Sequence, residues 1–474
     1  MRILLASPYR GKTYESVGIR VPPLGLLYIG GALREAGHEV KLDLSEDVNS
    51  QEDIDFSDAE IVGITSTTSQ FNKALKIAKA AHELGKTVIM GGPHPTSSPE
   101  ETLKSGFVDY VVRSEGEATA VELLQGIEQS NGHFDPSKVL GISWVDKETG
   151  TVVNNPTRPF IGDLDALPYP ARDLGGDVMK YRNKGIDGQV SPTMITTRGC
   201  PYGCKFCDVH LLAGRRWRMR NPKSVADEIE HLVTEYNAQD IRIMDDIINF
   251  SNEKLHNMFD AIIERNFNVT FWVMGRADML NKDPSSAEKM AKAGVRAMFL
   301  GIESPSKRIL KAYHKGGKAS ADTSEQAVRL LREHGVEAYG GFIIGEPTET
   351  EEEINETIDY AKHINPATAQ FSILTPYPGT EIWNQLKDRL LIHDWDKFDG
   401  LHAVFHGEHL KASEIEALCR RAYIRFYVRP KRIAGQIYAA IRGKDSMGPR
   451  LKTVSKIFTL LKTIYPKDDL PINK

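Results

Sequence analysis

The chain has 474 residues and a formal net charge of −4, and 41% of its residues are hydrophobic and 26% charged. This composition is typical of a globular protein with two or three domains. The charge gives no reason to expect nucleic acid binding, and no run approaches the ~20 apolar residues that a membrane span needs. Residues 1–8 have the pattern of a buried strand and not of a signal peptide, so we expect a cytoplasmic protein.

Strands and helices alternate along the first part of the chain. Two helical patterns end at Gly37 and Gly85. Strands separated by helices of this length form a parallel sheet that is covered on both faces. We therefore predict an α/β fold that begins with a Rossmann-like, doubly wound domain over residues 1–130, whose ligands bind at the carboxyl ends of the strands. The predicted strands are 3–6, 39–43, 61–65, 87–90 and 110–112, and the helices are 24–36 and 72–84.

Residues 131–190 are predicted to be a hairpin and a linker. Two short apolar runs, 143–145 and 151–153, surround a turn at 148–150. The proline-rich segment 167–170 is unsuited to the interior of a helix or strand.

A second alternating series extends over residues 191–395. Six strand-helix units predict a partial (β/α)6 barrel, whose reactive groups lie at the carboxyl ends of its strands. The last part, residues 396–474, is predicted to be helical, and it is basic from Arg420 onward with aromatic residues between the cations. The predicted barrel strands are 194–197, 241–244, 269–274, 297–300, 338–344 and 370–374, with helices at 224–236, 253–264, 324–334 and 351–363.

Three of the four cysteines, Cys200, Cys204 and Cys207, directly follow the first predicted barrel strand. In a reducing compartment such clustering indicates metal binding and not disulfides. Three thiolates on one loop can hold three corners of a 4Fe-4S cluster and leave the fourth iron open. The alternative is a zinc site, which needs a fourth ligand, and His210 is the nearby candidate. The isolated Cys419 is typical of a small buried hydrophobic residue.

This C-x3-C-x2-C spacing resembles the radical S-adenosylmethionine superfamily, and the similarity covers about residues 190–390. The resemblance implies that the three cysteines hold one 4Fe-4S cluster, which cleaves S-adenosyl-L-methionine to methionine and a 5′-deoxyadenosyl radical. It also implies a set of contacts to S-adenosylmethionine. These are Phe206 and Gly345 near the adenine, Asp245 and Asp246 at the amino group, Arg276 at the carboxylate and Glu303 at the ribose.

Simpler roles remain open for some of these residues. Asp245 and Asp246 can be a helix cap or a solvated pair, and Arg276 can form a structural ion pair with Asp278.

The first domain resembles the cobalamin-binding domain that precedes the barrel in one large subclass of this superfamily. The similar segments are 22–26, 66–69, 91–94 and 116–117. The motif D-x-H-x-x-G, whose histidine ligates cobalt in other cobalamin enzymes, does not occur, so the resemblance implies cobalamin without a histidine on its lower face. The alternative is a Rossmann-like domain that binds no corrin. The residues implied to contact cobalamin are Ser66, Thr67, Gly91, Gly92, Gly116 and Glu117.

Together these resemblances imply a cobalamin-dependent C-methyltransferase that acts on an unactivated carbon. One alternative is a cobalamin-associated oxidative cyclase or carbon–carbon bond-forming enzyme on a lipid or porphyrin-like substrate, and another is a non-catalytic iron–sulfur scaffold. The expected partners are a small-molecule or lipid substrate and reduced ferredoxin or flavodoxin as the electron donor, with no nucleic acid. The basic C-terminal segment is either a solvated helical cap or a contact with an anionic membrane surface.

Overall fold

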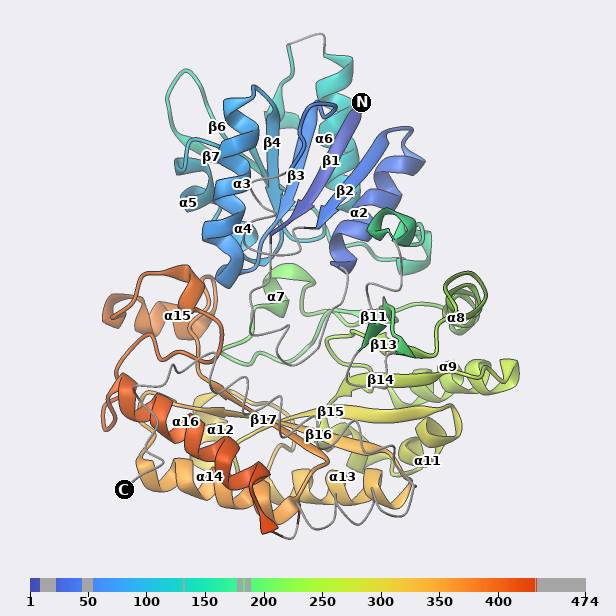
Figure 1. Cartoon of the computed structure of the whole chain (residues 1–474), viewed down its shortest axis with the longest axis vertical. Coiled ribbons are helices and arrows are strands. Elements are labelled where there is room, and N and C mark those ends of the chain that lie inside the picture. Colours follow the sequence, from blue (N-terminus) through green and yellow to red (C-terminus); the bar gives the residue numbers. More distant parts are fainter. Residues whose placement is uncertain are drawn as a thin grey trace.

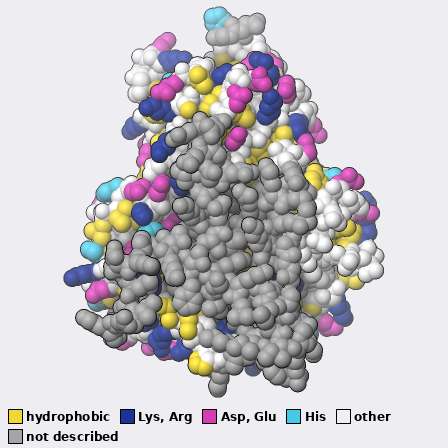
Figure 2. All heavy atoms as spheres, in the orientation of Figure 1, with side chains coloured by type: hydrophobic (Ala, Val, Ile, Leu, Met, Phe, Trp, Pro, Cys, Tyr) yellow, Lys and Arg dark blue, Asp and Glu magenta, His cyan; other side chains and the backbone are white. Residues whose placement is uncertain are grey.

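The computed structural model describes residues 1–8, 23–44, 54–130, 133–176, 189–430 and 432, and the backbone of residues 182–183. Two large sheets dominate it, one from the first third of the chain and one from the remainder (Figure 1). On the described part of the surface, side chains of both charges are interspersed (Figure 2). No helix among the described residues is long and apolar enough to cross a membrane.

The first sheet has seven strands in the order β2-β1-β3-β4-β5-β6-β7. Its first five strands are parallel, and all of them except the edge strand β2 are largely apolar, because helices cover both faces. Helices α2 and α6 pack on one face and α3 on the other. The predicted doubly wound fold is thus confirmed. The elements are β1 (Arg2–Ser7), α2 (Leu24–Glu35), β2 (Glu39–Leu44), β3 (Ile61–Thr65), α3 (Phe71–Glu83), β4 (Thr87–Gly91), β5 (Tyr110–Val112) and α6 (Glu117–Gln129).

The hairpin that was predicted beside the linker belongs to this first sheet. Its strands are β6 (Ile142–Val145) and β7 (Val152–Asn154), and β6 pairs antiparallel with β5. If a short apolar strand such as β5 were exposed at a sheet edge, its unpaired backbone groups could pair with another chain. The hairpin covers that edge, so the sheet extends to Asn154 and not only to residue 130.

The second sheet has six parallel strands in the order β10-β13-β14-β15-β16-β17. The outer strands β10 and β17 form the two edges of an incomplete barrel, with helices along its outside (Figure 1). This confirms the predicted partial barrel. The strands are β10 (Thr193–Met194), β13 (Asp240–Ile243), β14 (Thr270–Gly275), β15 (Val295–Glu303), β16 (Glu337–Ile344) and β17 (Thr368–Ile373). The longer helices are α8 (Pro222–Tyr236), α9 (Asn252–Arg265), α11 (Ser285–Lys292), α13 (Ala321–Glu333) and α14 (Glu351–Ile364).

Helix α16 (Ala412–Tyr427) covers the open edge at β17. The Tyr423 hydroxyl donates to the Phe371 carbonyl at 2.9 Å and accepts from the Phe371 N–H at 3.2 Å. Tyr427 does the same at Ala369, at 2.8 and 3.0 Å. Cys419 is 1% exposed on the same helix, as expected for a structural thiol.

The described cations of this basic segment bind the barrel. Arg421 pairs with Glu351 at 2.7 Å, and Arg425 pairs with Asp359 at 2.8 Å, both on α14. Most of the segment, residues 433–474, lies outside the described part of the chain.

A buried ion-pair network joins the linker to the barrel. Glu228 of α8 is fully buried and accepts from Arg172 at 2.6 Å and from Arg220. Replacing Glu228 with alanine leaves two buried guanidinium groups without their carboxylate, so we expect the free energy of unfolding to fall by about 3 to 5 kcal/mol. Urea titration followed by circular dichroism measures the loss.

Glu230→Ala is the matched control, because Glu230 lies on the same helix but its side chain is 54% exposed and pairs with Arg265 at the surface. We expect this control to lose only about 0 to 1 kcal/mol. Equal losses in the two variants would contradict a special role for the buried network.

Candidate functional site

The three clustered cysteines lie on a loop, here called the cysteine loop (residues 199–208), that leaves strand β11 (Thr197–Arg198). Strand β11 pairs antiparallel with β12 (Arg218–Met219), and the Cys200 N–H donates to the Gly214 carbonyl at 3.2 Å. Gly199 begins the loop with φ +87°, and a Cβ there would collide with the carbonyl of Arg216. Glycine is therefore required where the loop leaves the strand.

The three thiols are partly buried, and burial raises the pKa of each, for Cys207 to about 12. The backbone N–H groups of Tyr202 and Val209 donate to the sulfur atoms of Cys200 and Cys207. A thiol in such a setting loses its proton when a metal binds, and hydrogen bonds to sulfur are typical of iron–sulfur sites. The chemistry of this donor set therefore fits a cluster.

A single metal ion fits the loop less well. Within the described residues, no three His, Cys, Asp or Glu side chains converge on a position that could hold one ion. The thiolates of a cubane bind different iron atoms and do not need such convergence. His210, the candidate fourth ligand of zinc, has its Nδ1 3.0 Å from the Cys207 carbonyl oxygen.

Asp245 and Asp246 follow β13 and hold the backbone that leads into the cysteine loop. Asp245 is 1% exposed, and its Oδ1 accepts from the N–H groups of Thr196 at 2.6 Å and Thr197 at 2.9 Å. Its Oδ2 accepts from the Thr196 hydroxyl at 2.5 Å. Both oxygens of Asp245 are thus used, which favours a positioning role over the predicted contact with an amino group. Asp246 is exposed and accepts from Gly199 N–H at 2.9 Å.

Arg276 at the end of β14 forms the ion pair that was the alternative prediction. Its Nε lies 2.9 Å from Asp278 Oδ1, and its guanidinium lies 3.6 Å from the ring centre of Tyr202 in the cysteine loop. The cation is therefore at the cluster side of the barrel, where its charge can attract a carboxylate as well.

Glu303 ends β15 with φ +62°, a backbone conformation that residues other than glycine rarely adopt. Lys315 holds it there, because Lys315 Nζ lies 2.7 Å from Glu303 Oε1 and 3.0 Å from the Gly301 carbonyl. Glu303 is 6% exposed, and its Oε2 has no hydrogen-bond partner among the described residues. A buried acceptor without a partner is costly, so this oxygen fits a hydroxyl of a ligand.

Phe206 belongs to the cysteine loop, and Gly345 follows strand β16 of the barrel. Phe206 packs edge-on against Tyr313, with ring centres 5.4 Å apart. Gly345 has φ +84° and donates its N–H to Glu349 Oε2 at 2.6 Å. Glu349 is 1% exposed, and burial raises its pKa to about 8.

The predicted cobalamin contacts lie at the carboxyl edge of the first sheet. Gly91, Gly92 and Gly116 are only partly buried, so some of their backbone is accessible there. Gly92 has φ +96°, and a Cβ there would lie 2.7 Å from the Thr65 hydroxyl oxygen. Glycine at this position therefore allows the ends of β3 and β4 to lie close together. Thr67 is exposed, whereas Ser66 is fully buried and donates to the Thr67 carbonyl at 2.8 Å. The partly exposed glycines permit the close approach of a flat ligand, whereas Ser66 has no exposed surface to contact one.

Glu117 has a partner that the sequence did not predict. It pairs with Arg198 of β11 at 2.6 Å, and Glu115 pairs with Arg218 of β12 at 2.9 Å. Burial alone would lower the pKa of Arg198, but Glu117 beside it raises that pKa. The two strands that bracket the cysteine loop are thus attached to the carboxyl edge of the first sheet.

Three residues of the site were not predicted from the sequence. These are Lys315, which pairs with Glu303, Tyr313, which packs on Phe206 of the cysteine loop, and Glu349, which accepts from Gly345. All three are far from the cysteines in sequence. A lysine before two glycines and a glutamate after a strand are weak signals, and their burial follows only from the fold.

Two protein-family models match the chain. The B12 binding domain matches residues 13–124, and the Radical SAM superfamily matches residues 194–361. The first range contains the carboxyl edge of the first sheet, and the second contains the cysteine loop.

The chain resembles curated proteins over most of its length. It is 36% identical over 449 residues to an uncharacterized methyltransferase of Pyrococcus horikoshii, which covers 92% of this chain and 95% of the relative. It is 27% identical over 442 residues to the anaerobic magnesium-protoporphyrin IX monomethyl ester cyclase of Rubrivivax gelatinosus, covering 90% of this chain and 78% of the relative.

Among solved structures, the fold is similar to that of OxsB, a cobalamin-dependent S-adenosylmethionine radical enzyme, with aqua-cobalamin and S-adenosylmethionine bound. The TM-score is 0.72 at 18% identity, and the match covers 98% of this chain and 70% of the other. At this identity the likeness concerns the fold alone.

Asp245 offers a test that separates positioning from ligand contact. In Asp245→Asn the amide oxygen still accepts from both backbone N–H groups and the amide nitrogen can donate to Thr196, so iron retention and S-adenosylmethionine affinity should stay close to those of the wild type. Asp245→Ala removes all three bonds, and we expect iron retention to weaken about tenfold. Iron assay after gel filtration and equilibrium dialysis with labelled S-adenosylmethionine measure both. Loss of ligand affinity in Asp245→Asn with iron intact would indicate direct contact instead.

Glu349 makes stability depend on pH. Its carboxyl pKa is raised to about 8, so the folded state holds the proton more tightly than the unfolded state and stability falls as pH rises from about 4.5 to about 8. Glu349→Gln can still accept from Gly345, and it should be more stable than the wild type at pH 8 by on the order of 1 to 3 kcal/mol, with a smaller difference at pH 5. Thermal unfolding across this range measures the effect, and a gap that does not change with pH would refute it.

Proposed function

Because the chain belongs to the family of radical S-adenosylmethionine enzymes that carry a cobalamin-binding domain, we propose that it is a cobalamin-dependent methyltransferase acting on an unactivated carbon. One observation carries the proposal: the strands that bracket the cysteine loop are ion-paired to the carboxyl edge of the domain that matches the B12 binding model. This attachment supports a shared cavity for the two proposed cofactors. The methyltransferase relative supports methyl transfer as the outcome.

The proposal assigns each cofactor to residues of the chain. Cys200, Cys204 and Cys207 would hold a 4Fe-4S cluster, with S-adenosylmethionine beside them. When bound, the cluster and S-adenosylmethionine supply hydrogen abstraction from carbon, and the cobalamin supplies the methyl group. The residues proposed for S-adenosylmethionine are Phe206, Asp246, Arg276, Glu303 and Gly345, and those proposed for cobalamin are Thr67, Gly91, Gly92 and Gly116.

The chain's own residues orient these groups. Asp245 fixes the backbone before the loop, and Lys315 fixes Glu303 so that one oxygen remains for a ligand hydroxyl. Arg276 places a cation where a carboxylate can bind, and its pair with Asp278 keeps the guanidinium from swinging away.

A second candidate function is oxidative cyclisation, because the magnesium-protoporphyrin cyclase matches 90% of this chain. In that case the carbon radical would form a ring and not take up a methyl group. The substrate would be a small molecule, with a lipid or a porphyrin-like compound as the proposed class. We also propose that the protein is cytoplasmic and that its basic C-terminal segment contacts an anionic membrane surface.

The first experiment measures cobalamin retention. The cluster is reconstituted without oxygen, hydroxocobalamin is added, excess is removed by gel filtration, and cobalt per chain is assayed. Near-stoichiometric cobalt is expected, and no cobalt with the cluster intact would exclude the methyltransferase. Transfer of label from S-adenosylmethionine carrying a deuterated methyl group then separates methyl transfer from cyclisation.

Cys204→Ser tests the cluster assignment. We expect it to lose the cluster absorption and all cleavage of S-adenosylmethionine under dithionite, since three thiolates are needed to hold the cubane. Cys419→Ala is the control, because Cys419 is buried in α16 and should leave iron content and cleavage unchanged. Full cleavage by Cys204→Ser would overturn the assignment.

A further inference from the structure

A basic groove opens beside the cysteine loop. It has a volume of about 640 Å³ and includes Gly203, which lies between two of the clustered cysteines. Four of the described residues that line it are cations, and one is a carboxylate. These are Arg215, Lys307, Lys311 and Lys315, with Glu381.

The charge of this groove is available to a partner. Lys307, Lys311 and Arg215 are exposed and form no ion pair within the described part of the chain. Glu381 lies 3.1 Å from Lys205 of the cysteine loop, so the negative charge of the groove is already offset. A concentration of unpaired cations in one groove attracts an acidic surface and steers its approach.

The cysteine loop itself forms part of the wall of the groove, because Gly203 lines it. The Arg215 guanidinium packs so closely on Gly203 that a Cβ there would lie 2.7 Å from its Nη1. Gly316 also lines the groove, and a Cβ added to it would lie 3.3 Å from the Tyr202 ring. A redox centre seated in the groove would therefore be next to the loop that carries Cys200 and Cys204.

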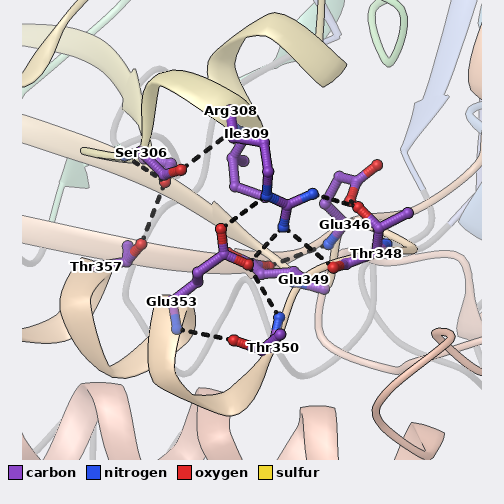
Figure 3. Close-up of polar contacts among 11 residues, drawn as sticks. Ser306, Arg308, Ile309, Glu346, Thr348, Glu349, Thr350, Glu353 and Thr357 are labelled. Atoms are coloured by element: carbon purple, nitrogen blue, oxygen red, sulfur yellow. Dashed lines mark hydrogen bonds and ion pairs between the residues drawn. The ribbon is translucent and has the colours of Figure 1, made fainter.

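The helix that presents the lysines is held in a fixed position. Helix α12 (Lys307–Ala312) is anchored to the start of α14 by Arg308, whose Nε donates to Glu353 at 2.9 Å and whose guanidinium also binds Thr348 (Figure 3). At the other end of α12, the Tyr313 carbonyl accepts from the Lys205 N–H at 3.0 Å. The helix that carries Lys307 and Lys311 is thus attached at one end to α14 and at the other to the cysteine loop.

We propose that this groove is the docking surface for an acidic one-electron donor protein. The inference rests on the proposed function, because only a redox cluster on the cysteine loop needs an electron from outside. One electron passes from the reduced donor to the oxidised 4Fe-4S cluster, whose charge changes from 2+ to 1+. The donor is oxidised by one electron, and no bond of the chain forms or breaks.

The test uses the cluster-loaded full chain with two probes, a bacterial flavodoxin and a bacterial ferredoxin. Their affinity is measured by isothermal titration at low and high salt, and reduction of the cluster is followed by electron paramagnetic resonance. For the preferred donor, Lys307→Glu/Lys311→Glu should weaken binding and slow cluster reduction about tenfold or more at low salt, with a smaller effect at high salt. Lys307→Gln/Lys311→Gln should give an intermediate loss.

Two controls make the result specific. Cleavage of S-adenosylmethionine driven by dithionite, a small reductant that needs no docking surface, should be unchanged in both double variants. Lys104→Glu/Lys147→Glu alters two exposed lysines of the first sheet's domain and should leave donor affinity unchanged.

The inference is overturned if neither donor binds the wild type, or if Lys307→Glu/Lys311→Glu binds and is reduced as well as the wild type. Failure of the proposed function has a different signature, namely no cleavage of S-adenosylmethionine by the wild type under dithionite. Since donor affinity is measured separately from cleavage, the two failures are distinguishable.

Discussion

Two buried ion pairs decide how the sheets of this protein face each other. Arg198 and Arg218 come from the strands that bracket the cysteine loop, and Glu117 and Glu115 come from the carboxyl edge of the first sheet. Charges that are removed from water are stable only when paired in good geometry. A rotation of one sheet against the other would separate these pairs and leave buried charges behind. The cysteine loop and the carboxyl edge of the first sheet therefore lie beside each other, because this arrangement satisfies the four side chains.

The cysteine loop inherits its position from these contacts. Asp245 fixes the strand before the loop, and Gly199 permits the turn out of it. Lys205 and Tyr313 then join the loop to α12. The loop itself has little regular structure, so its shape depends on anchors outside it, such as Asp245 after β13 and Tyr313 at the end of α12. Groups on a loop are placed less precisely than groups on a strand, so these anchors are needed to position the cysteines.

Local signals predicted the parts of this protein that depend on local physics. Apolar runs of strand length identified the strands of both sheets, and the spacing of the cysteines identified the loop. Long-range partners were beyond such signals. Nothing near Glu117 indicates that its partner is Arg198, and the hairpin at β6 and β7 does not reveal which strand it will cover. The place of Asp245 at a strand end is the same whether it binds a ligand or a backbone, so the sequence leaves both roles open.

The tyrosines of α16 show how an incomplete barrel can end. Tyr423 and Tyr427 are one helical turn apart, and the backbone groups they bind, at Phe371 and Ala369, are two strand residues apart. Four helical residues rise about 6 Å and two strand residues about 6.7 Å, so the two repeats are nearly commensurate. A helix can therefore act as the hydrogen-bonding neighbour of a strand with side chains in place of its own backbone. This match holds for only two contacts before the mismatch accumulates, which is enough for a strand as short as β17.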